Sequence, residues 1–259
     1  MAETAHIDNA RRGESPMNST VDPAEIERFS RIAGEWWDAN GKFAPLHKLN
    51  PTRIGYIRDR AALHFGRDAL SSPLAGLSVL DIGCGGGLLS EPMARLGGSV
   101  TGLDAGDKNV AVAALHAQGQ GLAIDYRQGT AEALAGTAAQ YDIVLALEIV
   151  EHVADVDLFL RSCGQLVKPG GLLFLSTLNR TAKAWALAIA GAEYVLGWVP
   201  RGTHDWKKFL KPSEVVRGLA NGGVTAKEIV GVVYSPLSRQ WSLNARDLDV
   251  NYMLHGTKA

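Results

Sequence analysis

From Leu77 onward, the chain alternates short apolar runs with helical patterns. The runs "LSVLDIG", "SVTGLD", "YDIVLALE" and "GGLLFLSTLN" are apolar along almost their whole length rather than at every second position. Strands of this kind are buried on both faces, as they are in a parallel sheet that helices cover on both sides. The chain therefore predicts a doubly wound α/β fold, and "TAKEIVGVVY" and "VNYMLHGT" predict two further strands at one edge.

Two helices are predicted before the sheet. In "VDPAEIERFSRIAGEWWD", Asp22 can cap the helix and Pro23 fits its first turn, while apolar residues recur at helical spacing. The next stretch, "NGKFAPLHKLNPTR", is predicted to be a loop because Pro45 and Pro51 interrupt it. "IGYIRDRAALHFG" then predicts a second helix that ends at Gly66.

Length, charge and cysteine content limit the protein class. With 259 residues and a formal net charge of −1, the chain can bury a large core and has no global field that would attract nucleic acid. Cys84 and Cys163 are the only cysteines, so neither a disulfide scaffold nor a cysteine-rich zinc site is expected. No secretory signal or long apolar run is visible, which predicts a cytoplasmic protein. We expect a disordered leader over residues 1–20 and one domain over 21–259, in which 21–70 form a helical cap.

A glycine-rich turn, "VLDIGCGGGLL", follows the first strand. Glycines such as Gly83 and Gly85 let the backbone turn sharply and approach a ligand, at the strand end where doubly wound folds bind ligands. Asp104 ends the second strand, 21 residues after Gly83, and can accept hydrogen bonds from the ribose hydroxyls of an adenosine. Leu88 stands where a dinucleotide fingerprint needs its third glycine, which disfavours an NAD-dependent oxidoreductase. Asp81 suits the amino group of a methionine moiety, so the loop favours S-adenosylmethionine.

Several longer motifs resemble a known family. "LDIGCGGG", "GLD" and "EHVADVDLFL" resemble class I S-adenosylmethionine-dependent methyltransferases, and "WWD", "FAPLHKLNPTRIGYI", "GAEYVLGWVPRGTHDWKKFLKP" and "DVNYMLH" resemble the ubiquinone biosynthesis O-methyltransferase family. The resemblance runs from about Val21 to His255. It implies a mostly parallel, seven-stranded Rossmann-like sheet with its last strand antiparallel, N-terminal helices over the cofactor, and a helical insertion after the fifth strand. It also implies O-methylation of phenolic hydroxyls of polyprenylated ubiquinone precursors, namely a polyprenyl catechol-type intermediate and 3-demethylubiquinol.

The predicted cofactor site joins residues of the glycine loop to residues that the resemblance implies: Asp81 and Gly85, with Arg53, Gly83, Asp104 and Leu147. A guanidinium group at Arg53 suits the carboxylate of the cofactor. A surface salt bridge for Arg53 and a core position for Leu147 are the alternatives. Thr130, Ala131 and Glu132, which follow the third strand, are expected to border the adenine.

The stretch "LEIVEH" places Glu148, Glu151 and His152 at the end of the fourth strand, beside the expected sulfonium. At positions i, i+3 and i+4 of a helical turn, these side chains would point the same way. A phenol has a pKa of about 10, so its methylation near neutral pH needs a base or a cation. One of the three can be the general base, the three together can hold Mg²⁺, or Glu151 and His152 can merely cap the next helix. The sequence leaves these three interpretations open.

Residues 180–212 are too many for a simple connection. Apolar residues share one helical face there and basic residues flank it: Trp185, Ile189, Ala192, Leu196 and Val199, with Arg180, Lys183, Arg201, Lys207, Lys208 and Lys211. The segment predicts a lid packed on the core, or a helix in the membrane interface with its basic residues on anionic lipids. The second role would place the protein peripherally on the inner face of the bacterial cytoplasmic membrane. His204 and Asp205 are expected to border the acceptor or to form a simple turn.

Other functions stay open beside the phenol methyltransferase. The acceptor can be another small molecule, or the chain can be a non-catalytic regulator that binds S-adenosylmethionine. A pure binder has no need for titratable groups at the sulfonium, so "LEIVEH" favours an enzyme. Besides the polyprenylated phenol or quinol and anionic lipids, other ubiquinone biosynthesis enzymes are candidate partners.

Overall fold

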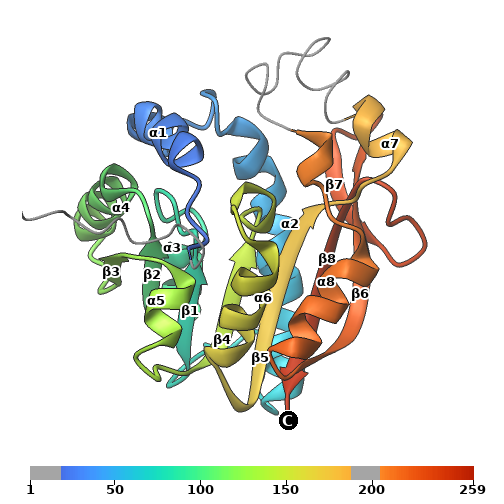
Figure 1. Cartoon of the computed structure of the whole chain (residues 1–259). Coiled ribbons are helices and arrows are strands. Elements are labelled where there is room, and N and C mark those ends of the chain that lie inside the picture. The colour runs from blue at the N-terminus through green and yellow to red at the C-terminus, as the bar shows by residue number, and fades with distance from the viewer. Residues whose placement is uncertain (1–18, 188–204) are drawn as a thin grey trace, which may run out of the picture.

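The computed structural model describes residues 19–187 and 205–259, which form one eight-stranded sheet covered by helices (Figure 1). Its strands are β1 (Ser78–Ile82), β2 (Ser99–Asp104), β3 (Asp125–Gln128), β4 (Tyr141–Leu147), β5 (Val167–Leu178), β6 (Val224–Ser235), β7 (Gln240–Asn244) and β8 (Asn251–Lys258). They lie in the order β3-β2-β1-β4-β5-β8-β6-β7. Strands β1 to β5 are parallel to one another, and β8 is antiparallel to both of its neighbours. The predicted α/β fold class is confirmed.

The sheet has one strand more than the seven that we expected. Strand β7 pairs antiparallel with the end of β6, from Ser235 opposite Gln240 to Gly231 opposite Asn244. Its five residues form the edge of the sheet, where only Trp241 packs against the core. A strand this short, with one apolar contact, leaves little periodic signal in the sequence.

Helices lie on both faces of the sheet. They are α1 (Pro23–Arg31), α2 (Ala44–His64), α3 (Ser90–Arg95), α4 (Asp107–Gly119), α5 (Ala131–Ala135), α6 (Val156–Gln165), α7 (Ala182–Ala184) and α8 (Pro212–Asn221), with the 3-10 turns η1 (Ala33–Glu35), η2 (Val150–His152) and η4 (Trp206–Lys208). One core cluster joins β1, β4 and β5 to α6 and α8, and the other joins the opposite face to α2 and α3. The two clusters explain why these strands are apolar along their whole length.

The N-terminal helices differ from the prediction in their bounds. Helix α1 begins after Asp22, whose side chain accepts a hydrogen bond from the backbone of Ala24, but it ends well before Trp37. The stretch predicted as a loop is helical, because α2 begins at Ala44 and contains both of its prolines. Pro45 lies in the first turn, where a missing N–H costs nothing. Pro51 lies inside the helix, which continues because its buried face packs on the sheet.

Helix α1 and turn η1 lie at the end of the sheet toward which β1 and β4 point (Figure 1). Their apolar side chains form a small cluster with α2 and with Leu88 of the glycine loop. Residues 1–18 of the predicted leader and 188–204 of the predicted insertion lie outside the described residues. Within the described residues, no helix is both long and apolar enough to span a bilayer.

Candidate functional site

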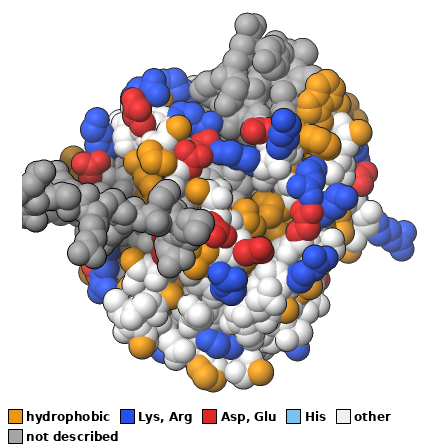
Figure 2. Space-filling model, viewed as in Figure 1, with side chains coloured by type: hydrophobic (Ala, Val, Ile, Leu, Met, Phe, Trp, Pro, Cys, Tyr) orange, Lys and Arg blue, Asp and Glu red, His pale blue; other side chains and the backbone are white. Residues whose placement is uncertain are grey.

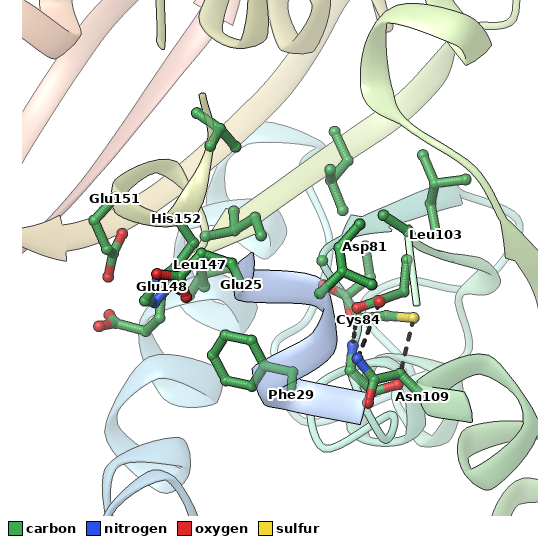
Figure 3. A pocket seen from close by; sticks show the side chains of 18 of the residues that line it. Glu25, Phe29, Asp81, Cys84, Leu103, Asn109, Leu147, Glu148, Glu151 and His152 are labelled. Carbon is green, nitrogen blue, oxygen red and sulfur yellow. Dashed lines mark hydrogen bonds and ion pairs between the residues drawn. The ribbon is translucent and has the colours of Figure 1, made fainter. Parts of the chain in front are cut away.

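A cavity of about 780 Å³ lies at the carboxyl ends of β1, β2 and β4, under helix α1 (Figure 3). This is the edge of a doubly wound sheet where ligands bind. The predicted site residues that line it are Arg53, Asp81, Gly83, Gly85, Asp104, Leu147, Glu148, Glu151 and His152. The structure therefore brings all of them to one cavity.

The glycine loop turns sharply after β1, with Gly83 and Gly85 in the left-handed region at φ +71° and +53°. A Cβ atom at Gly83 would lie 2.7 Å from Ile149, and one at Gly85 would lie 2.5 Å from Trp36. The sequence predicts glycine here for the approach of a ligand. The structure adds that side chains of the chain itself also approach the loop.

Asp104 ends β2 and points into the cavity beside the glycine loop. The backbone N–H of Gly85 donates to its Oδ2 at 2.9 Å, and the N–H of Gly106 donates to its Oδ1 at 2.8 Å. Asn109 also donates to Oδ1, at 3.1 Å. Burial raises the pKa of Asp104, and these three hydrogen bonds oppose that effect. The carboxylate is thus held in one orientation.

Asp81 lies near the end of β1 and is fully buried. Ser90 Oγ donates to its Oδ2 at 2.6 Å. Burial raises the pKa of Asp81 to about 7, although Ser90 and the nearby positive charge of Arg53 oppose this. A buried carboxylate with so few partners suits a cationic group of a ligand.

Arg53 comes from α2 and is 4% exposed, so it is not the surface salt bridge that was the alternative. It donates a short hydrogen bond to Asn50 Oδ1, and its Nη1 lies 3.7 Å from Glu148 Oε1. Its Nε is buried and has no hydrogen-bond partner among the described residues. Burial lowers the pKa of Arg53, and Glu148, Asp81 and Glu151 raise it. Leu147 lines the same cavity and is 8% exposed, so it is a core residue as well.

Glu148, Glu151 and His152 do not share one helical turn. Glu148 has a left-handed backbone at φ +53°, and only residues 150–152 form a 3-10 turn. Ser176 donates to Glu148 at 2.5 Å and Thr177 donates to Glu151 at 2.8 Å, while His152 faces α1. Burial raises the pKa of Glu151 to about 7, and His152 opposes this while Glu148 adds to it.

The prediction that these three side chains hold Mg²⁺ is not supported. In the described parts of the chain, no three His, Cys, Asp or Glu side chains form a group that could hold a metal ion. Spacing of i, i+3 and i+4 brings side chains together only on a regular helix, whereas the left-handed turn at Glu148 sends these side chains to separate partners.

Glu25 also belongs to the site, although nothing in its sequence context indicates this. Its Oε2 lies 3.3 Å from His152 Nδ1 and 2.7 Å from Arg28 Nη2. Although burial acts to raise the pKa of Glu25, its contacts with His152, Arg28 and Lys208 lower it overall. The Phe29 ring meets the imidazole of His152 edge to face, with centroids 5.3 Å apart. Glu25 therefore keeps its negative charge beside His152 (Figure 3).

The residues expected to border the adenine and the acceptor differ in where they lie. Thr130 and Ala131 line the cavity. Glu132 turns away and accepts hydrogen bonds from the backbone and hydroxyl of Thr20. Asp205 caps η4 through the N–H of Lys207, which fits the simple-turn interpretation. His204 lies outside the described residues.

Comparison with known proteins decides the family. Residues 80–175 match the family model of a methyltransferase domain. A ubiquinone biosynthesis O-methyltransferase from Parvibaculum lavamentivorans is 56% identical over 251 residues, which are 96% of this chain and 99% of the relative. One from Chelativorans sp. is 57% identical over 241 residues, which are 93% of this chain and 95% of the relative. The chain belongs to the ubiquinone biosynthesis O-methyltransferase family.

Membership of this family confirms the predicted class, an S-adenosylmethionine-dependent O-methyltransferase. Solved structures are similar in fold. Magnesium protoporphyrin IX methyltransferase from Synechocystis PCC 6803 with bound SAH has a TM-score of 0.60 at 21% identity, over 92% of this chain and 95% of that one. The same enzyme with bound SAM has a TM-score of 0.58 at 17% identity, over 94% and 100%. At these identities the likeness concerns the fold alone.

Proposed function

We propose that the protein transfers the methyl group of S-adenosylmethionine to phenolic hydroxyls of polyprenylated ubiquinone precursors, a polyprenyl catechol-type intermediate and 3-demethylubiquinol. The observation that carries this proposal is the 56% identity to a ubiquinone biosynthesis O-methyltransferase over nearly the full length of both chains. The cavity supports it, because it combines two buried carboxylates, a buried guanidinium group and a histidine.

The charges in the cavity fit a zwitterionic nucleoside. Asp104 would accept a hydrogen bond from the ribose, and Asp81 would hold the ammonium group. Arg53 would hold the carboxylate, since its buried Nε has no partner within the part of the chain that the structure describes. Gly83 and Gly85 let the cofactor approach the backbone, and Leu147 bounds the cavity. When bound, S-adenosylmethionine supplies an activated methyl group on a sulfonium.

His152 is the proton acceptor in this proposal. Its Nδ1 faces the ionised Glu25, which leaves Nε2 for the phenol. A carboxylate on one ring nitrogen fixes the tautomer and stabilises the imidazolium that forms. Glu148 and Glu151 line the same cavity, and the carboxyl group of Glu151 interacts electrostatically with the imidazole. The rest of the catalysis is alignment of the oxygen with the methyl group and exclusion of water.

The test is methyl transfer from S-adenosylmethionine to a short-chain polyprenyl catechol, measured with EDTA and with added Mg²⁺. Activity that is indifferent to EDTA and lost in His152→Ala is the expected result. Activity lost in EDTA and restored by Mg²⁺ would keep the acceptor but replace the metal-free base. No transfer in either condition, with cofactor binding intact, would refute the acceptor class.

We also propose that residues 180–212 bring the protein to anionic membranes, peripherally on the inner face of the cytoplasmic membrane. Beside the undescribed residues, Trp185 and Leu187 are 52% and 53% exposed and Trp206 is 38% exposed. Figure 2 shows apolar side chains gathered over α7, with Lys and Arg side chains nearby. Exposed apolar groups next to basic ones are typical of interfacial binding.

Vesicle flotation tests this second proposal. The protein should float with vesicles that contain anionic phospholipid, and Trp185→Glu should weaken this. Leu237→Glu is the matched control, because Leu237 is 97% exposed in the turn between β6 and β7. Absence of flotation, or equal loss in both variants, would contradict the proposal.

A further inference from the structure

Trp36 lies directly on the glycine loop, although it comes from the N-terminal cap. Its side chain is buried and stacks on Phe43, with ring centroids 3.6 Å apart and planes 10° apart. A Cβ atom at Gly85 or at Gly86 would collide with its indole ring. Because these two glycines have no side chains, the ring can pack directly on the loop that borders the cofactor cavity.

A chain of hydrogen bonds runs from Trp36 to the carboxylate at the end of β2. The indole Nε1 donates to Asn109 Oδ1 at 2.9 Å, and Asn109 Nδ2 donates to Asp104 Oδ1 at 3.1 Å. An indole N–H can only donate and a carboxylate can only accept. The amide between them therefore has a single orientation that satisfies both contacts, and the indole N–H selects it.

The fixed amide leaves the carboxylate of Asp104 with further capacity to accept a hydrogen bond. Its Oδ1 accepts from Gly106 and Asn109, and its Oδ2 accepts from Gly85. Because a carboxylate accepts about four hydrogen bonds, about one accepting site on Oδ2 has no donor among the described residues. A hydroxyl group can donate to this site. If the amide turned over, its oxygen would face Oδ1 and repel it, and the carboxylate would lose its alignment.

We propose that Trp36 is a positioning residue for the ribose of the cofactor: its N–H locks the Asn109 amide, which holds Asp104 ready to accept a ribose hydroxyl. This inference rests on the proposed role of Asp104 as the ribose acceptor. Trp36 belongs to the N-terminal cap, whereas Asp104 belongs to the sheet. The cap therefore sets the affinity for the cofactor, in addition to covering it.

Calorimetric binding of S-adenosylhomocysteine to the full chain tests the inference. Trp36→Phe keeps the stacked ring and removes the N–H, and it should raise the Kd about three- to tenfold, as loss of one hydrogen bond does. The 2′,3′-dideoxyribose analogue should bind the variant and the unchanged protein alike. Trp37→Phe is the matched control, because the Trp37 N–H donates to Gly86 O at 2.9 Å without reaching Asp104. It should not discriminate between the two probes.

Two further variants keep the outcomes distinct. Asp104→Asn should weaken the probe that carries ribose hydroxyls more than the dideoxyribose analogue, and equal weakening of the two probes would refute the ribose role itself. With that role upheld, a Trp36→Phe variant that weakens both probes equally, or neither, overturns the inference. Should Trp36→Phe fail to fold, Asn109→Ala must give the same selective loss, because it removes the amide without the indole. Equal binding of both probes there would also overturn the inference.

Discussion

Asp81→Asn is expected to stabilise the cofactor-free protein while abolishing tight cofactor binding. The carboxyl group is fully buried, and its pKa rises from 3.8 to about 7 on folding. Asparagine has the same shape and still accepts the hydrogen bond from Ser90. The substitution therefore removes a buried charge and leaves the packing in place.

The magnitude follows from proton linkage. Between pH 3.8 and about 7 the folded protein binds a proton that the unfolded chain has released, so stability falls as the pH rises through this window. At about 1.36 kcal/mol for each pH unit, the full cost of ionised Asp81 is about 4 kcal/mol above pH 7. About 2 kcal/mol of it develops between about pH 5.5 and about pH 8. For a chain of this length, this corresponds to roughly 4–8 °C in Tm.

Thermal unfolding at several pH values measures this effect. The advantage of Asp81→Asn over the unchanged protein should grow by about 2 kcal/mol from about pH 5.5 to about pH 8. Glu27→Gln is the control, since this side chain is 74% exposed and pairs with Arg31 on the surface. Any steric effect of the asparagine is the same at both pH values. An advantage that does not grow with pH would refute the reasoning.

Three other substitutions test the site and the core. Arg53→Lys keeps the charge but not the planar fork, so the Kd for S-adenosylmethionine should rise roughly tenfold or more, and an unchanged Kd would remove Arg53 from the cofactor site. Glu25→Gln should lower kcat roughly tenfold by loosening His152, with cofactor affinity unchanged; a change in affinity alone would contradict that role. Phe174→Ala, at a fully buried position, should cost about 3–5 kcal/mol in urea unfolding, against less than about 0.5 kcal/mol for Leu237→Ala.

The strands and the glycine turn could be predicted because their signals are local. An apolar run followed by glycines indicates both a strand and the place where it ends, so the sequence alone predicts that Asp81, Gly83 and Asp104 lie at one edge of the sheet. At Pro51 the local signal led to a wrong prediction, a loop where the structure has a helix. A proline ordinarily breaks a helix, but packing of α2 on the sheet outweighs one lost hydrogen bond.

The residues that the sequence did not reveal act over long separations. Asn109 lies 73 positions after Trp36, and nothing in either segment indicates that they meet. Glu25 and His152 are likewise joined only when α1 folds over the cavity. Spacing predicts the direction of a side chain only where the backbone conformation is known. The left-handed conformation of Glu148 interrupts the regular helix that the i, i+3, i+4 spacing requires.

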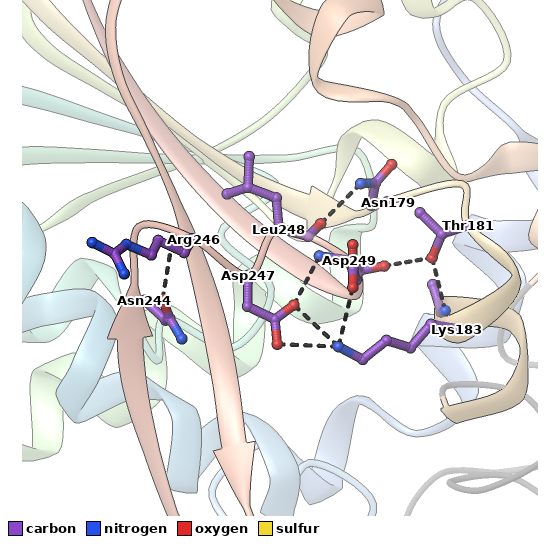
Figure 4. A network of polar contacts seen from close by, with 9 residues as sticks. Asn179, Thr181, Lys183, Asn244, Arg246, Asp247, Leu248 and Asp249 are labelled. Atoms are coloured by element: carbon purple, nitrogen blue, oxygen red, sulfur yellow. Dashed lines mark hydrogen bonds and ion pairs between the residues drawn. The ribbon is translucent and has the colours of Figure 1, made fainter.

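The residues before 188 and those after 204 form ion pairs with different parts of the fold. Lys183 Nζ lies 3.1 Å from Asp247 Oδ2 and 3.2 Å from Asp249 Oδ2, and the hydroxyl of Thr181 donates to the backbone of Asp249 (Figure 4). On the other side, Lys208 Nζ lies 2.9 Å from Asp22 Oδ2, next to helix α1. Because these pairs are exposed or half-buried, each contributes about 1 kcal/mol or less.

At position 148, the residue that best suits the left-handed backbone differs from the acidic residue that we expect methyl transfer to favour. A non-glycine residue in this conformation costs on the order of 1 kcal/mol, which glycine or asparagine would largely recover. A library selected for heat resistance alone should drift toward those two residues here, whereas a library selected for methyl transfer should retain the acid. Sequencing the two pools would show which demand shapes this turn.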